Sequence, residues 1–129
     1  MGIAGIEKII KTYLKCLESG NYEKMIKLFA DNAIVFSPLY GKIKAADFYK
    51  KLFTDTSKSK ITMLNIFRGS DKHTAAGYFR YDWVLKDGTP TSFECVDVFR
   101  FNREGKIKEL KIIYDTSKVR PSFEKMKEK

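Results

Sequence analysis

Apolar residues recur at helical spacing in three stretches of the N-terminal half. In residues 4–19 they follow the i, i+3, i+4, i+7 pattern of an amphipathic helix that ends at Gly20. Asn21 is a suitable cap for a second helix that ends near Asp31, and a third apolar stripe covers residues 45–53. The first half of the chain therefore predicts three helices. A short strand at 34–36 and a loop at 37–41 lie between the second and the third.

The second half changes to the alternating pattern of β-strands. Strands are expected at residues 61–68, 74–86, 91–101 and 106–115, after a polar, turn-rich segment at 54–60. Turn residues separate the strands, above all Asp87-Gly88. Helices followed by hairpin-linked strands predict an α+β fold, and 129 residues suit a single domain over 1–129. The lysine-rich segment 116–129, which contains Pro121, is expected to be a loosely attached tail, either frayed or a short helix.

One carboxylate falls on an otherwise apolar strand face. Asp97 shares its face of the strand 91–101 with Phe93, Cys95, Phe99 and Phe101. A carboxylate in such a place must find hydrogen-bond partners or keep its proton. On the next strand Leu110, Ile112 and Tyr114 are expected to share this inner face.

A tyrosine lies on the apolar stripe of the first helix. Tyr13 is in register with Ile6, Ile10 and Leu17, so its ring should point inward and its hydroxyl group needs a buried partner. Such a tyrosine is more often ordinary core than a functional group.

The strand around residues 78–86 allows two registers. Phe79, Tyr81, Trp83 and Leu85 form one face, and Tyr78, Arg80, Asp82 and Val84 form the other. Composition alone would bury the aromatic face and leave the Arg80 and Asp82 side chains in solvent. The sequence leaves both registers open.

Composition excludes several classes of function. The chain has 25 Lys and Arg against 16 Asp and Glu, but the basic residues are spread along helix faces, so nucleic-acid binding is not expected. Cys16 and Cys95 lack metal-site spacing and are best explained as buried thiols in a reducing compartment. No long apolar run or targeting signal appears at the Met-Gly-Ile-Ala-Gly start. We expect a soluble, cytoplasmic protein without a metal or cofactor and without membrane contact.

The hairpin around Asp97 resembles a known enzyme family. Residues 96–102 with Gly105-Lys106, together with Tyr13-Leu14, Gly20-Asn21, residues 28–33, Pro38 and Gly41, are similar to the ketosteroid isomerases and SnoaL-like proteins of the nuclear transport factor 2 superfamily. The resemblance implies a cystatin-like cone, in which a curved antiparallel sheet wraps three helices around a pocket. It also places Tyr13 and a protonated Asp97 at the two oxyanion-hole donors of the isomerases.

The resemblance departs from the isomerases at the catalytic base. Ser37 stands where these enzymes carry an aspartate directly before the proline, and a serine needs a partner to accept its proton. An ungapped comparison would point Arg80 and Asp82 into the pocket, with Asp82 as a replacement base and an outer aromatic face suited to homodimer formation. The implied catalytic set is Tyr13, Asp97 and Asp82. The positions expected to contact a ligand are Ser37, Tyr40, Phe53, Arg80, Cys95, Phe99, Leu110, Ile112 and Tyr114.

These residues support three functions. The first is enzymatic: Tyr13 and Asp97 would polarise a carbonyl group in isomerase, cyclase or dehydratase chemistry on a small apolar compound. The second is a non-catalytic module that holds a small apolar or aromatic ligand, and the third is a structural dimer in which Asp97 and Tyr13 only satisfy each other. Epoxide hydrolysis is improbable, because Cys95 and Ile112 occupy the places of the arginine and second acid expected for that family.

Overall fold

The computed structural model of the chain describes residues 3–128, so Met1, Gly2 and Lys129 lie outside the described part. The helices are α1 (Ile3–Ser19), α2 (Tyr22–Ile26), α3 (Ala45–Thr54) and α4 (Val119–Lys127). The strands are β1 (Phe29–Ser37), β2 (Gly41–Lys44), β3 (Thr56–Arg68), β4 (Thr74–Leu85), β5 (Pro90–Phe101) and β6 (Ile107–Ile113).

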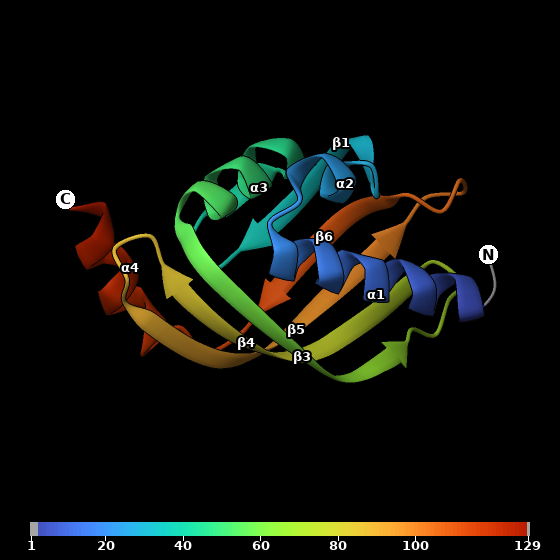
Figure 1. Cartoon of the computed structure of the whole chain (residues 1–129). Coiled ribbons are helices and arrows are strands. Elements are labelled where there is room, and N and C mark those ends of the chain that lie inside the picture. The colour runs from blue at the N-terminus through green and yellow to red at the C-terminus, as the bar shows by residue number, and fades with distance from the viewer. Residues whose placement is uncertain (1–2, 129) are drawn as a thin grey trace.

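The six strands form one open sheet in the order β2-β1-β6-β5-β4-β3. Figure 1 shows the sheet curving around α1, α2 and α3, as expected for the α+β cone. The strand pairs are antiparallel except for β1 and β6, which are parallel. The hydrophobic core fills the space between the concave face of the sheet and these helices.

The start of the sheet differs from the sequence prediction. Asn21 caps α2 by accepting a hydrogen bond from the Lys24 amide at 3.1 Å, but the helix ends at Ile26. Phe29, predicted to be helical, begins β1 and pairs with Ile107 of β6. The Leu28 carbonyl accepts the Ile107 amide at 2.9 Å, so a strand 79 positions later in the chain sets the end of the helix.

The prediction of a turn-rich segment at residues 54–60 is also wrong, since residues from Thr56 onward belong to the long edge strand β3. Its small polar side chains have partners on β4. The Trp83 indole donates to the Thr56 hydroxyl group at 2.8 Å, and the hydroxyl groups of Ser59 and Tyr81 lie 3.1 Å apart. Buried aromatic residues with polar tips therefore explain why a polar stretch forms a strand.

The register of β4 follows composition rather than the ungapped comparison. Phe79, Tyr81, Trp83 and Leu85 are buried on the inner face. Arg80 and Asp82 lie on the outer face, where their side chains are 51% and 36% exposed and form an ion pair at 3.2 Å. The expectation that these two residues enter the pocket is therefore wrong, because a one-residue shift in register exchanges the two faces of a strand.

The C-terminal segment is not a loosely attached tail. Residues 119–127 form α4, and Val119, Phe123 and Met126 of this helix are buried. Arg120 donates from its guanidinium group to the Pro38 carbonyl at 2.7 Å, which links the helix to the loop after β1. The last described turns of the chain are thus part of the packed structure.

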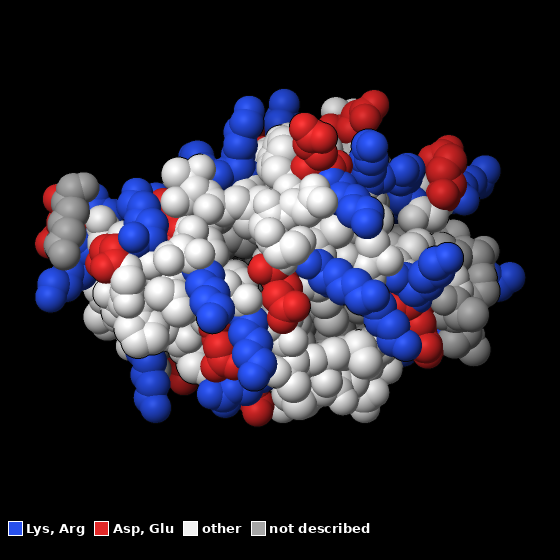
Figure 2. All heavy atoms as spheres, viewed as in Figure 1, with Lys and Arg blue, Asp and Glu red and all other residues white. Residues whose placement is uncertain are grey.

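The charged side chains are spread over the surface, as predicted. Figure 2 shows lysine and arginine side chains scattered across the visible face, with acidic side chains between them and white areas in between. None of the helices within residues 3–128 has the length and apolar character needed to cross a membrane. In the same residues, no three His, Cys, Asp or Glu side chains are grouped so that they could hold a metal ion.

A glycine in β4 permits close packing next to Asp97. Gly77 is the partner of Asp97 across the β4–β5 pair, and a Cβ atom added there would lie 3.2 Å from Ile10 Cγ2 and 3.6 Å from Phe99 Cε1. Helix α1 can approach the sheet at this point because no side chain intervenes.

Replacement of Gly77 by valine should therefore lower the free energy of unfolding by about 1–3 kcal/mol, because the added methyl groups overpack the contact with Ile10. Chemical denaturation monitored by circular dichroism measures this change. Ala76→Val, on the outer face of the same strand, is the control and should change stability by less than about 0.5 kcal/mol. Equal effects at both positions would contradict the close approach of α1.

Candidate active site

Asp97 is buried at the centre of the molecule with 1% of its surface exposed. It lies on β5 between Gly77 of β4 and Ile112 of β6, so the backbone on both sides is fixed by the sheet. Its Oδ2 atom accepts a hydrogen bond from the Tyr13 hydroxyl group at 3.1 Å, and its Oδ1 atom accepts one from the Cys95 thiol at 3.1 Å. The structure thus brings together the acid and the phenol that the sequence predicted to meet.

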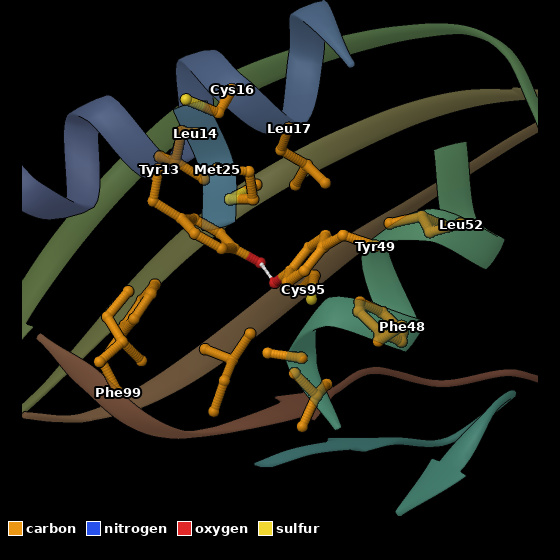
Figure 3. Close-up of a cluster of buried hydrophobic side chains, with 14 of the residues drawn as sticks. Tyr13, Leu14, Cys16, Leu17, Met25, Phe48, Tyr49, Leu52, Cys95 and Phe99 are labelled. Atoms are coloured by element: carbon orange, nitrogen blue, oxygen red, sulfur yellow. Dashed lines mark hydrogen bonds between the residues drawn. The ribbon is translucent and has the colours of Figure 1, made fainter. Parts of the chain in front are cut away.

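A second tyrosine extends this pair into a chain of hydrogen bonds. The hydroxyl oxygens of Tyr13 and Tyr49 are 2.6 Å apart, as the dashed line in Figure 3 marks. Since Tyr13 donates its hydrogen to Asp97, the hydrogen between the two phenols comes from Tyr49. The chain therefore runs from Tyr49 on α3 through Tyr13 on α1 to Asp97 on β5.

Burial controls the protonation of this group. Desolvation raises the pKa of the Asp97 carboxyl group to about 7, against the hydrogen bonds from Cys95 and Tyr13, which lower it. Desolvation, with the nearby acidic groups, also raises the pKa values of Tyr13 and Tyr49 well above their ordinary value, so both phenols keep their protons. Near neutral pH the Asp97 carboxyl group is therefore protonated in some molecules and ionised in others.

The chain of hydrogen bonds ends at a small aromatic cavity of about 40 Å³. This volume has room for only a few water molecules. Its lining is mainly apolar and comes from α1, α3, the loop after β1 and strands β4–β6. The lining residues are Tyr13, Leu17, Ser37, Leu39, Tyr40, Phe48, Leu52, Phe79, Tyr81, Trp83, Phe93, Cys95, Asp97, Ile112 and Tyr114.

Five of the nine positions expected to contact a ligand line this cavity: Ser37, Tyr40, Cys95, Ile112 and Tyr114. The remaining four do not. Phe99 packs edge-on against the Tyr13 ring at 5.0 Å, and Leu110 is fully buried in the core. Phe53 lies at the end of α3 beside the Tyr49 ring, and Arg80 is on the outer face of the sheet.

Asp82, the candidate replacement base, is also outside the cavity. It accepts hydrogen bonds from Ser92 at 2.6 Å and from Arg80, both on the outer face of the sheet. These partners lower the pKa of Asp82, so it is an ordinary surface carboxylate. Within the described residues, Asp97 is the only carboxylate that lines the cavity.

Ser37 occupies the place of the isomerase base but has a turn-forming role. Its hydroxyl oxygen accepts hydrogen bonds from the backbone amides of Leu39 at 3.2 Å and Tyr40 at 3.1 Å. These contacts stabilise the turn after β1 and keep the Ser37 hydroxyl group at the cavity wall. No hydrogen bond from Ser37 to a carboxylate or histidine is present in residues 3–128, so nothing there activates it as a base.

Sequence reasoning missed Tyr49 and the aromatic residues of β4. Tyr49 is fully buried on α3, and the rule that led to Tyr13, that a tyrosine on an apolar helix stripe needs a buried partner, applies to it equally. Tyr81 and Trp83 became lining residues once the register of β4 was settled. Their polar tips bond to β3, so mainly ring surface faces the cavity.

A curved sheet wrapped around three helices, with an aromatic cavity that ends on an acid–phenol pair, defines a class of small pocket-forming domains with the cystatin-like fold. The solved structures that are similar to this chain include the following three. The Δ5-3-ketosteroid isomerase from Mycobacterium sp. is 18% identical over 87% of this chain and 94% of its own, with a TM-score of 0.72.

The other two structures are similarly distant in sequence. SalBIII, an epoxide hydrolase/cyclase-like enzyme in pyran ring formation of the polyether salinomycin, is 19% identical over 87% of this chain and 92% of its own, with a TM-score of 0.74. A protein of unknown function with a cystatin-like fold from Methylobium petroleophilum PM1 is 20% identical over 88% of this chain and 78% of its own, with a TM-score of 0.73. At these identities the similarity establishes the fold.

The family itself is shown by the sequence match. Residues 10–110 match the SnoaL-like domain, and this stretch includes α1 from Ile10 onward, α2, α3 and most of the sheet. The chain belongs to the SnoaL-like family, as the resemblance around Asp97 implied.

The raised pKa of Asp97 predicts a specific dependence of stability on pH. A carboxyl group with a pKa of about 7 in the folded state and about 4 in the unfolded state costs stability as the pH rises from 4 to 7. In Asp97→Asn this cost is absent. As the pH rises from 4 to 8, the free energy of unfolding of the variant minus that of the wild type should therefore increase by up to about 4 kcal/mol.

Urea denaturation at a series of pH values measures this difference. Asp82→Asn, which changes an exposed carboxylate on the same sheet, is the control and should keep the pH profile of the wild type. Parallel profiles for wild type and Asp97→Asn would show that Asp97 titrates at its ordinary pKa.

Proposed function

We propose that this protein binds a small, flat, largely apolar carbonyl or phenolic compound, with Tyr13 turning its hydrogen from Asp97 to the oxygen of the ligand and protonated Asp97 donating to the same oxygen. The observation that supports this most strongly is the hydrogen-bond chain from Tyr49 to Asp97 at the inner end of the cavity. An acid with a pKa of about 7 donates a hydrogen bond in roughly half of the molecules at neutral pH. The aromatic lining supplies the apolar contacts that a ring compound prefers.

The same arrangement favours isomerase or cyclase chemistry on a carbonyl compound. When a C–H group next to a carbonyl loses its proton, negative charge develops on the oxygen. Donors fixed at that oxygen stabilise the charge, and each contributes about 3–4 kcal/mol in a site without water. Tyr49 strengthens the donor, because its hydrogen bond to the Tyr13 oxygen further stabilises the Tyr13 hydroxyl as it donates.

Neither candidate for the catalytic base is suited to accept the proton. Asp82 lies on the outer face, and Ser37 has no activating partner among the described residues. A missing base costs about 100- to 10,000-fold in rate. We therefore propose ligand binding as the primary activity, with slow enolisation as its catalytic consequence, and a non-catalytic binding module as the second candidate.

Binding of 2-naphthol tests the role of the two donors. Tyr13→Phe and Asp97→Asn should each weaken its affinity about 10- to 100-fold, as expected for loss of a hydrogen bond to a charged or strongly polarised oxygen. Fluorescence titration measures the affinity. Asp82→Asn serves as the control and should bind like the wild type. Unchanged affinity in both pocket variants would mean that the acid and the phenol only satisfy each other.

Deuterium exchange at the carbon next to the carbonyl of 1-indanone separates an enzyme from a binding module. NMR in heavy water should show exchange above the buffer rate for the wild type and a loss of that excess in Tyr13→Phe. Asp82→Ala should exchange like the wild type, because its carboxylate is outside the cavity. Binding without any excess exchange would establish the non-catalytic module.

Homodimer formation through the outer face of the sheet stays a proposal, and it no longer has the support of an aromatic outer face. The aromatic row on which it depended faces the cavity. The outer face still carries Ile113, which is 51% exposed, between the ion pairs Arg80–Asp82 and Arg100–Glu109. Sedimentation equilibrium would decide between one and two chains.

A further inference from the structure

The C-terminal helix α4 stands behind one wall of the cavity. The Phe123 ring lies 5.1 Å from the Tyr40 ring and 6.3 Å from the Trp83 ring, and both of those residues line the cavity. Phe123 itself does not line it. The helix therefore holds two lining rings in place from behind, at the end of the sheet near the β4–β5 hairpin (Figure 1).

Two polar contacts attach α4 to this wall. Lys127 Nζ lies 2.6 Å from Asp55 Oδ2, and the Tyr40 hydroxyl group donates to the same oxygen at 2.7 Å. At the other end of the helix, Arg120 donates to the Pro38 carbonyl at 2.7 Å. The loop of residues 37–40, which supplies three lining residues, is thus clamped by α4 at Pro38 and Tyr40.

The Asp55 carboxylate is at the centre of the clamp. It is 1% exposed, and its other oxygen lies 3.4 Å from Lys86 Nζ. Burial raises its pKa, but the hydrogen bonds from Lys127, Tyr40 and Lys86 outweigh that effect and hold the pKa below its usual range. The side chains of Lys127 and Lys86 are 43% and 45% exposed. Displacement of α4 would hydrate these charges and leave Asp55 paired with Lys86, so the polar contacts open at low cost, and exposure of Val119, Phe123 and Met126 accounts for most of the cost of opening.

The cavity is too small for the ligand proposed above unless a wall moves. An apolar cavity of about 150 Å³ is known to bind a single benzene ring, whereas this one measures about 40 Å³. The opposite walls are strands β4 and β5, which are paired along their whole length, and the buried helix α1. The wall formed by the loop 37–40 and α4 is instead held by side-chain contacts, namely the polar contacts above and the buried side chains of Val119, Phe123 and Met126, and α4 lies outside the residues that match the family.

We propose that α4 and the loop 37–40 form a displaceable wall that admits ligands to the cavity and that limits their size through Phe123. The proposal rests on the proposed function for the identity of the ligand. The opening itself is independent of any ligand, and a thiol inside the cavity reports on it.

Alkylation of Cys95 by iodoacetamide measures the opening. Cys95 lines the cavity and is 2% exposed, so the reagent reaches it when the wall moves. Cys16 on α1 is 3% exposed and does not line the cavity, so it reports global unfolding in the same sample. Mass spectrometry of the two peptides gives both rates.

Lys127→Met should accelerate alkylation of Cys95 about 5- to 10-fold relative to Cys16, the effect of losing one partly exposed charged contact. Asp55 keeps Lys86 and Tyr40 in this variant, so the fold is retained. Lys125→Met, a change of an exposed lysine on the same helix, is the matched control and should leave both rates unchanged. No acceleration of Cys95, or equal acceleration of both thiols, would overturn the proposal.

Ligand size gives the second readout. Phe123→Ala should raise the affinity for 2-naphthol relative to phenol by about tenfold, because Tyr40 and Trp83 can then recede. An unchanged ratio would contradict a limit set by Phe123. If Tyr13→Phe leaves naphthol binding unchanged while Lys127→Met exposes Cys95, the proposed function fails and the displaceable wall stands. The reverse pattern would remove the wall and leave the function intact.

Discussion

A carboxyl group deprived of water at the centre of the sheet determines how the rest of the molecule is arranged. Asp97 receives hydrogen bonds from Tyr13 of α1 and from Cys95 of its own strand, and Tyr49 of α3 supports Tyr13 from behind. One interaction therefore joins the first helix, the third helix and the middle of the sheet. The surroundings are aromatic, so desolvation is the dominant influence on the acid and brings its pKa into the neutral range.

The walls of the cavity follow a related rule. The polar tips of three lining residues form hydrogen bonds with partners other than Asp97: Tyr81 with Ser59, Trp83 with Thr56, and Tyr40 with Asp55. Ring surface is left to face the cavity, while the acid–phenol pair offers the hydrogen bonds. This division supports the proposed ligand, in which one oxygen meets the acid–phenol pair and the rest of the molecule is apolar.

The same polar contacts relate the site to the C-terminal helix. Tyr40 bonds to Asp55, and Asp55 in turn binds Lys127 of α4. A lining residue of the cavity is thus connected to a helix that the SnoaL-like match, residues 10–110, does not include. The matched stretch contains the acid and the phenol, and the segment beyond it packs against one wall of the cavity.

Much of the site could be predicted from local patterns. Alternation along residues 93–101 placed Asp97 on an apolar face, and the 3.6-residue period placed Tyr13 inward, because side-chain direction within a helix or strand depends on near neighbours. Five of the expected ligand contacts also line the cavity. Ser37 was identified as a departure from the isomerase pattern, and its role in the turn became visible only in the structure.

The remaining features depend on contacts between residues far apart in the chain. Local pattern favoured the aromatic face of β4 but could not exclude the other register, and burial against α1 and β3 decided it, leaving Arg80 and Asp82 outside. Phe29 lies in a strand because it pairs with β6. Helix α4 is held in place by its contacts with Tyr40 and Asp55. The sequence by itself determined which faces are apolar and where the acid lies. Tertiary structure alone decided what those faces meet, because the free energy of pairing and burial comes from neighbours that local periodicity does not specify.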